Sequence, residues 1–231
     1  MKGQTFLKIG LSAALALTLI LIPFSQPSMW PLFAAAIAFA CIGLLLTEYE
    51  YRHSDPRMIS LVSVLAAVTI VSRQLIHGAE FSPVFFLVIL AGYTFGPVPG
   101  FTVGSVAMLV SNFSLGHGPW TPFQMLGVGL TGALAHYLPR HKRMELPVLA
   151  AYSFITAYGY GFFMDGLFWI AFMPSHDGTA LFAMLSSGMI ASTSRAAGNI
   201  FFMLILGPPV LKVFRRFGKR FTCEYVDINQ A

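Results

Sequence analysis

Long apolar runs alternate with short polar segments along this chain. A run of about 20 apolar residues crosses a ~30 Å hydrocarbon core as a helix, and in lipid each backbone N–H and C=O must be paired within its own segment. The runs lack the ~10-residue alternation of barrel strands. The pattern therefore predicts an all-α polytopic membrane protein of about eight spans. The predicted spans are Phe6–Phe24, Pro31–Thr47, Met58–His77, Phe81–Phe95, Phe101–Leu115, Thr121–Leu138, Pro147–Met173 and Ala180–Leu206.

The fourth and fifth runs are short and flank the segment GPVPG. Pro97 and Pro99 lack a backbone N–H and the two glycines relax the backbone, so we expect a tight turn between two spans rather than one kinked helix. A single re-entrant unit is the alternative, and it would change the number of spans.

Basic residues fall in every second loop of this topology. Short cytoplasmic loops carry an excess of Lys and Arg, so the pattern places both ends of the chain in the cytoplasm. Six spans would satisfy the same rule if the first two were absent. The first run is too long for the apolar region of a signal peptide, and no small-residue cleavage site follows it, so we expect it to be retained. The inside residues would be Lys2, Lys8, Arg52, Arg57, Arg140, Lys142, Arg143, Lys212, Arg215, Arg216, Lys219 and Arg220.

Composition agrees with this topology. Of the 231 residues, 56% are hydrophobic and 10% are charged, and the mean hydropathy is +0.73. The net charge of +5 is explained by the inside loops and by the tail KVFRRFGKRF, which suits an anionic inner leaflet, so no nucleic-acid partner is required. Cys41 lies in a span and Cys223 in the tail, so no disulfide is expected.

The sequence lacks the motifs of nucleotide hydrolysis and of common hydrolases. It has no G-x-x-x-x-G-K-[ST], no H-E-x-x-H and no G-x-S-x-G, and its histidines are scattered. We therefore expect no catalytic residues, no metal site and no covalently bound cofactor.

Three ionisable residues lie at membrane depth, where charge is costly and tends to mark a ligand pathway or a structural pair. Arg73 lies near the outer end of its span, Asp165 in the outer part of the seventh span, and Arg195 close to the middle of the eighth. One interpretation pairs Asp165 with Arg195 or Arg73 to neutralise both charges. The other interpretation is that these residues contact a ligand. Both interpretations can be true if the pair lines a cavity.

The segment SNFSLGHGPWTPFQM joins the external ends of two spans in this topology. Its glycines and prolines would form the turn, and Thr121 would cap the next helix. Trp120 would then be an interfacial aromatic residue and His117 a solvated loop residue. The turn alone does not explain Asn112, Trp120 and Gln124, which gain a role if a ligand lies above them.

This segment resembles the "SNF…GxGPWTPxQM" segment of the substrate-binding S components of energy-coupling factor (ECF) vitamin transporters, in the subgroup associated with cobalamin. The resemblance extends to VLAAVTIVSR, AGYTFGPVPGFTVGSVAML, FFMDGLFW and LGPPVLKVFRRF, and it covers roughly Met58 to Phe217. It implies a six-helix S-component core in residues 58–217. An N-terminal transmembrane hairpin and linker would occupy residues 1–57, and a cytoplasmic tail residues 218–231.

The resemblance also implies a function in the cell membrane. Such proteins bind a vitamin in a cavity open to the outside and deliver it through an ECF module of two ATPases and a transmembrane coupling protein. ATP would be used only by these partner subunits. Docking to the coupling protein uses small residues on the first core helix, often A-x-x-x-A. Here the match is Ser63-x-x-x-Ala67 with Ala66 beside it, and small residues permit close helix approach.

The ligand implied by the resemblance is cobalamin, whose amide side arms and flat ring call for amide partners and aromatic faces. The loops expected to face it are 77–83, 112–124 and 174–179. Arg195 departs from the mostly neutral pattern of this helix in the family and suits a carboxylate or a phosphate, and cobalamin carries one phosphodiester. The residues expected to contact substrate are Arg73, Asn112, His117, Trp120, Thr121, Gln124, Asp165, Trp169, Arg195 and Asn199.

Two other functions stay open. One is an S component for a different vitamin or a nucleobase-like compound, which ligand identification on the purified protein would reveal. The other is a small membrane enzyme or assembly factor, which turnover by the isolated chain would reveal.

Overall fold

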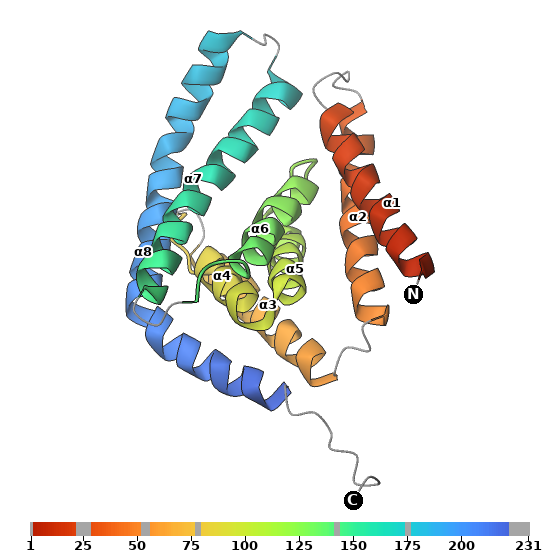
Figure 1. Cartoon of the computed structure of the whole chain (residues 1–231). Coiled ribbons are helices and arrows are strands. Elements are labelled where there is room, and N and C mark those ends of the chain that lie inside the picture. The colour runs from red at the N-terminus through yellow and green to blue at the C-terminus, as the bar shows by residue number, and fades with distance from the viewer. Residues whose placement is uncertain are drawn as a thin grey trace, which may run out of the picture.

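The structure is a computed structural model that describes residues 2–21, 29–51, 56–76, 80–140, 144–173 and 177–221. Within these ranges every regular element is a helix (Figure 1), so the all-α prediction is confirmed. Each predicted span overlaps one helix. The helices are α1 (Lys2–Leu21), α2 (Trp30–Tyr51), α3 (Pro56–Leu75), α4 (Val84–Phe95), α5 (Pro97–Leu115), α6 (Thr121–Ala135), α7 (Glu145–Phe172) and α8 (Gly178–Phe221).

The helix that contains the last predicted span is longer than that span. Helix α8 does not end near Leu206 but continues through Pro208 and Pro209 to Phe221. A proline removes one backbone donor and crowds the preceding turn, yet helices in membranes tolerate it where neighbouring groups satisfy the freed backbone. Figure 1 shows α8 changing direction, so that its last part runs across one end of the bundle.

Four helices are long and apolar enough to cross a membrane by length and composition among the residues that the structure describes. They are Pro56–Leu75, Pro97–Leu115, Glu145–Ile170 and Gly178–Gly218. Helix α4 has 12 residues and is therefore about 18 Å long, shorter than a hydrocarbon core. Most of its side chains are buried by its neighbours. Only Gly96, with φ 113°, separates α4 from α5, which is the tight turn predicted at GPVPG.

Helices α4, α5 and α6 pack backbone against backbone at the centre of the bundle. A Cβ on Gly100 would lie 2.5 Å from Gly92 Cα and 2.6 Å from the carbonyl oxygen of Gly132, so only glycine fits there. The close crossing sets these helices around a dense apolar core. Its fully buried members include Phe86, Ile89, Leu90, Val103 and Val128.

Helix α3 packs on α5 and α4, and the other four helices flank this centre. Helices α7 and α8 pair on one side of α4–α6, and the α1–α2 hairpin lies on the other (Figure 1). The hairpin packs on α6 through Trp30, Ile37 and Cys41, which cluster with Phe123 and Leu126. The rings of Trp30 and Phe123 lie 5.9 Å apart.

The two ends of the bundle differ in charge. At one end, which we call the basic end, Arg140 donates to the carbonyl oxygen of Tyr93 at 3.0 Å and Arg215 pairs with Glu145. The loop-charge pattern predicts that this end faces the cytoplasm. Parts of the predicted loops and the tail, residues 52–55, 77–79, 141–143, 174–176 and 222–231, lie outside the described residues.

Candidate ligand-binding site

Two adjoining cavities open at the end of the bundle opposite the basic end. The larger has a volume of about 300 Å³ and the smaller about 230 Å³. Arg73, Glu80, Ser82 and Gln124 line both of them. The larger is also lined by Val84, Phe85, Met108, Val128, Tyr160, Met164, Asp165, Ala191 and Arg195. The smaller is also lined by Ile76, Asn112, Leu115, Gly116 and Trp120.

Arg195 of α8 forms one wall of the larger cavity and is 7% exposed. Its Nη2 and Nε donate to Glu80 Oε2 at 2.7 and 3.1 Å, and its Nη1 donates to the carbonyl oxygen of Ala157 at 3.2 Å. The guanidinium lies 5.0 Å from the ring centre of Tyr160 and 5.9 Å from that of Phe85. An ion pair and two aromatic faces thus compensate a buried cation.

Glu80 reaches this arginine from the segment that precedes α4. Its backbone has φ 52°, a left-handed conformation that is uncommon for a residue other than glycine. Its side chain is 51% exposed, whereas that of Arg195 is 9% exposed. The carboxylate therefore joins an outer segment to the cavity wall, and backbone strain of this kind often accompanies a functional site.

Arg73 of α3 organises the smaller cavity. Its Nη1 donates to Ser111 Oγ and, at 2.7 Å, to Asn112 Oδ1. Asn112 Nδ2 in turn lies 2.9 Å from Thr121 Oγ1 and 2.8 Å from Gln124 Oε1, and donates to both. Because Asn112 is only 2% exposed, these bonds satisfy a buried amide while tying α3, α5 and α6 together.

Asp165 does not form the ion pair that one sequence interpretation gave it. In the described ranges Arg195 pairs with Glu80, and Arg73 donates to Ser111 and Asn112. The carboxylate of Asp165 lies instead against Gly188 of α8, about two helical turns before Arg195. Asp165 nevertheless lines the larger cavity, where its oxygens can accept hydrogen bonds from a ligand.

The structure divides the predicted substrate-contacting residues into two groups. Four of them line neither cavity. The His117 ring packs on Phe113 with 4.4 Å between centres, and Thr121 is a buried acceptor within the Arg73 network. Trp169 lies elsewhere on α7, and Asn199 is fully buried with no partner for its amide among the described residues. Those that line a cavity are Arg73, Asn112, Trp120, Gln124, Asp165 and Arg195.

Three polar residues that line the cavities were not among the predicted substrate contacts. Glu80 and Ser82 fall within the predicted 77–83 loop, but neither was among the residues expected to contact substrate. Tyr160 lies in a helix that is apolar around most of its circumference. No pattern in the sequence distinguishes it from the other aromatic residues of that helix.

The cavities combine groups suited to a polar planar ligand. Two guanidinium groups and an amide can donate hydrogen bonds, two carboxylates accept them, and Tyr160 and Phe85 offer aromatic surface. In the part of the chain that the structure describes, no three His, Cys, Asp or Glu side chains gather as a metal-ion site.

The predicted docking residues on α3 face different directions. Ser63 and Ala67 are exposed, whereas Ala66 is 4% exposed and packs inward. The Ser63 hydroxyl donates to the carbonyl oxygen of Ile59 at 2.9 Å, and the docking role of these residues stays a prediction.

A family model described as the S component of the ECF-type riboflavin transporter matches residues 53–216. The match covers most of the chain and includes α3 to α7 and most of α8, which form both cavities. The chain belongs to this family of ECF S components. Neither a curated protein nor a solved structure matches it.

As an ECF S component, the chain is a substrate-binding membrane subunit of a transporter rather than an enzyme. Its implied partner is an ECF module of ATPases and a coupling subunit. The resemblance to ECF S components is thereby confirmed. The matching family model names riboflavin, not cobalamin, in its description.

Proposed function

We propose that this S component captures a compact planar vitamin of the flavin type in the larger cavity and delivers it to an ECF module. The observation that carries the proposal is the convergence of Arg195, Tyr160 and Gln124 on a cavity of about 300 Å³. Cavities of this size bury drug-sized ligands. The description of the matching family model supports the same class of ligand.

A flavin fits the chemistry of both cavities. Its ring system is flat, and one edge of it alternates hydrogen-bond donors and acceptors, which suits Gln124 and Arg195 beside the face of Tyr160. Its polyol side chain suits the smaller cavity, where Arg73 and Asn112 lie.

Cobalamin is the second candidate ligand, favoured by the likeness of SNFSLGHGPWTPFQM to the cobalamin-type segment. Asn112, Trp120 and Gln124 supply the amides and the aromatic face that a corrinoid would need. A corrin ring with its nucleotide loop, however, is larger than either cavity. The volumes therefore favour the flavin.

Ligand identification on the purified protein tests the assignment. Protein in detergent is analysed for co-purified small molecules and titrated, without ATP, with riboflavin, cobalamin and cobinamide. We expect saturable quenching of riboflavin fluorescence, because its ring would stack on aromatic side chains. Saturable binding of a corrinoid alone would reassign the ligand, and binding of none of the three would reject both candidates.

Replacing Arg195 by Gln tests whether the larger cavity is the binding site. Loss of charge-assisted hydrogen bonds worth about 1.5–3 kcal/mol should weaken ligand binding about 10- to 100-fold. Gln74→Ala is the matched control, because Gln74 is exposed, bonds to Ser114 at 2.8 Å and lines neither cavity. Elution volume and melting temperature would verify that both variants are folded. If folded Arg195→Gln bound as tightly as the wild type, the site would lie elsewhere.

A further inference from the structure

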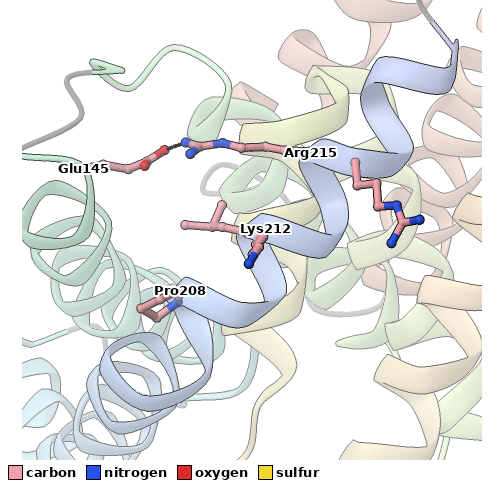
Figure 2. Close-up of a pocket in the computed structure, with 6 residues that line it drawn as sticks. Glu145, Pro208, Lys212 and Arg215 are labelled. Atoms are coloured by element: carbon pink, nitrogen blue, oxygen red, sulfur yellow. Dashed lines mark hydrogen bonds and ion pairs between the residues drawn. The ribbon is translucent and has the colours of Figure 1, made fainter.

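A third cavity, of about 500 Å³, opens at the basic end, far from both ligand cavities. It lies between the start of α7 and the part of α8 that follows the two prolines (Figure 2). Nothing in the capture of a vitamin at the opposite end accounts for it. Its lining residues are Glu145, Pro208, Leu211, Lys212, Arg215 and Arg216.

The wall of this cavity carries three cations and one carboxylate. Figure 2 shows Arg215 reaching across to Glu145, with which it forms an ion pair. The Glu145 side chain is 12% exposed and that of Arg215 is 50% exposed, so the charge of Arg215 is already partnered within the wall. Lys212 and Arg216 are exposed and have no hydrogen bond or ion pair among the described residues. Two cations are thus available to an anion that enters the cavity.

The same segment of α8 is amphipathic. Leu211 and Phe214 are 5% and 7% exposed, and the Phe214 ring packs 5.2 Å from that of Phe95 at the end of α4. Val213 and Phe217, by contrast, are 50% and 40% exposed beside the basic residues. Cations next to exposed apolar side chains are typical of a helix that lies in a membrane interface.

We propose that this cavity binds the phosphate headgroup of an anionic phospholipid in the leaflet at the basic end. The phosphate lies between Lys212 and Arg216, and the acyl chains lie along Val213 and Phe217. Basic pockets between membrane helices on the cytoplasmic side recognise such headgroups, and the predicted topology places the basic end on that side. A free phosphate would satisfy the cations but would leave the apolar side chains uncovered.

Native mass spectrometry of the full-length protein in detergent tests the proposal. Phosphatidylglycerol and phosphatidylcholine of equal chain length are added separately, and glycerol phosphate is added as a competitor. We expect phosphatidylglycerol to be retained in preference to phosphatidylcholine. Lys212→Gln and Arg216→Gln should each reduce its retention about fivefold. Arg57→Gln removes one charge from the start of α3, outside the cavity, and should leave retention unchanged.

Three results would overturn the proposal. Equal retention by the wild type and both cavity variants would show that these residues do not hold the lipid. An equal loss in Arg57→Gln would show diffuse attraction to basic charge rather than a site. Displacement of the lipid by glycerol phosphate at matched concentration would assign the cavity to a soluble phosphate. Vitamin titration of each variant reports its folding through the distant cavities, so misfolding is recognised separately.

Discussion

Asn112 shows at the scale of one residue how a buried amide can shape a cavity. It accepts a hydrogen bond from Arg73 and donates to Thr121 and Gln124, and it is almost wholly removed from solvent. A buried polar group left without a partner costs about 1–3 kcal/mol. Asn112 therefore fixes the orientation of two residues that line the cavities, Arg73 and Gln124.

We predict that Asn112→Ala lowers both the affinity for ligand and the melting temperature. The substitution leaves Arg73 and Gln124 without their shared partner, so the loss of affinity should reach about tenfold. Phe113→Ala, at the next residue of α5, is the control, because Phe113 is 76% exposed and lines neither cavity. Equilibrium titration and thermal unfolding in detergent would measure both effects. Equal affinities for the two variants would contradict a role for the Arg73 network in binding.

The Asp177 carboxylate caps the start of α8. It accepts the backbone N–H of Ala180 at 2.7 Å and the hydroxyl of Thr179 at 3.0 Å, and these bonds hold its pKa below the usual value. A lowered pKa in the folded state means that the stabilisation is present at neutral pH and is lost as the pH falls through that pKa.

We therefore predict that the first turn of α8 loses protection from hydrogen exchange in acid. Protection factors at Ala180 and Leu181 should fall as the pH is lowered from neutral to well below the ordinary aspartate pKa. Asp177→Asn keeps a capping oxygen but cannot titrate, so its protection should change little over this range. A fall of the same size in the Asn variant would assign the acid effect to another group.

At the scale of elements, helices α4, α5 and α6 pack closely because the glycines at their contacts have no Cβ. A Cβ on Gly132 would collide with the carbonyl oxygen of Gly100, and one on Gly104 would lie 2.8 Å from the carbonyl oxygen of Val128. Close backbone approach is a common source of helix association in membranes, because lipid provides little hydrophobic driving force between helices. The α4–α6 crossing in turn positions Gln124 and Met108 at the larger cavity.

We predict that Gly132→Ala destabilises the protein by at least the ~1–3 kcal/mol of an overpacked core. Gly159→Ala on α7 is the control, since its Cβ would meet nothing within 4 Å and alanine favours a helix by about 0.5–1 kcal/mol. The yield of monodisperse protein and its melting temperature would separate the two variants. Similar values would show that the α4–α6 crossing can relax to admit a methyl group.

The helices were easier to predict than their inward faces. In lipid, apolar length alone marks a span, so each of the eight predicted segments has a helix, including the short α4. Such segments are apolar on all sides, and periodicity does not reveal which side meets a cavity. For this reason Tyr160 was not predicted to line a cavity. Trp169 on α7 and Asn199 on α8 were predicted to contact substrate, but they line neither cavity. The partner of Arg195 was missed because Glu80 is 115 residues away in sequence.

At the scale of the whole molecule, the α1–α2 hairpin adds a separate layer. The family match begins at residue 53 and so leaves the hairpin outside it. Its contact with α6 is apolar and includes Trp30 against Phe123. Trp30 and Trp120 also line one small cavity of about 10 Å³, so the hairpin lies behind the segment that bears Trp120. The side-chain hydrogen bonds of Asn112, by contrast, run to α3 and α6.

We predict that a chain lacking residues 1–52 still inserts, folds and binds its ligand with an affinity within about twofold of the full chain. Removing the hairpin exposes Phe123 and Leu126 to lipid, which is as apolar as the side chains it replaces, so the free-energy cost is small. Full-length Trp30→Ala loosens the same contact without shortening the chain and should bind equally well. If the shortened chain lost affinity about tenfold while Trp30→Ala did not, the hairpin would hold the Trp120 segment through contacts other than this indole. If the shortened chain did not fold, α1 and α2 would belong to the folding core rather than to an added layer.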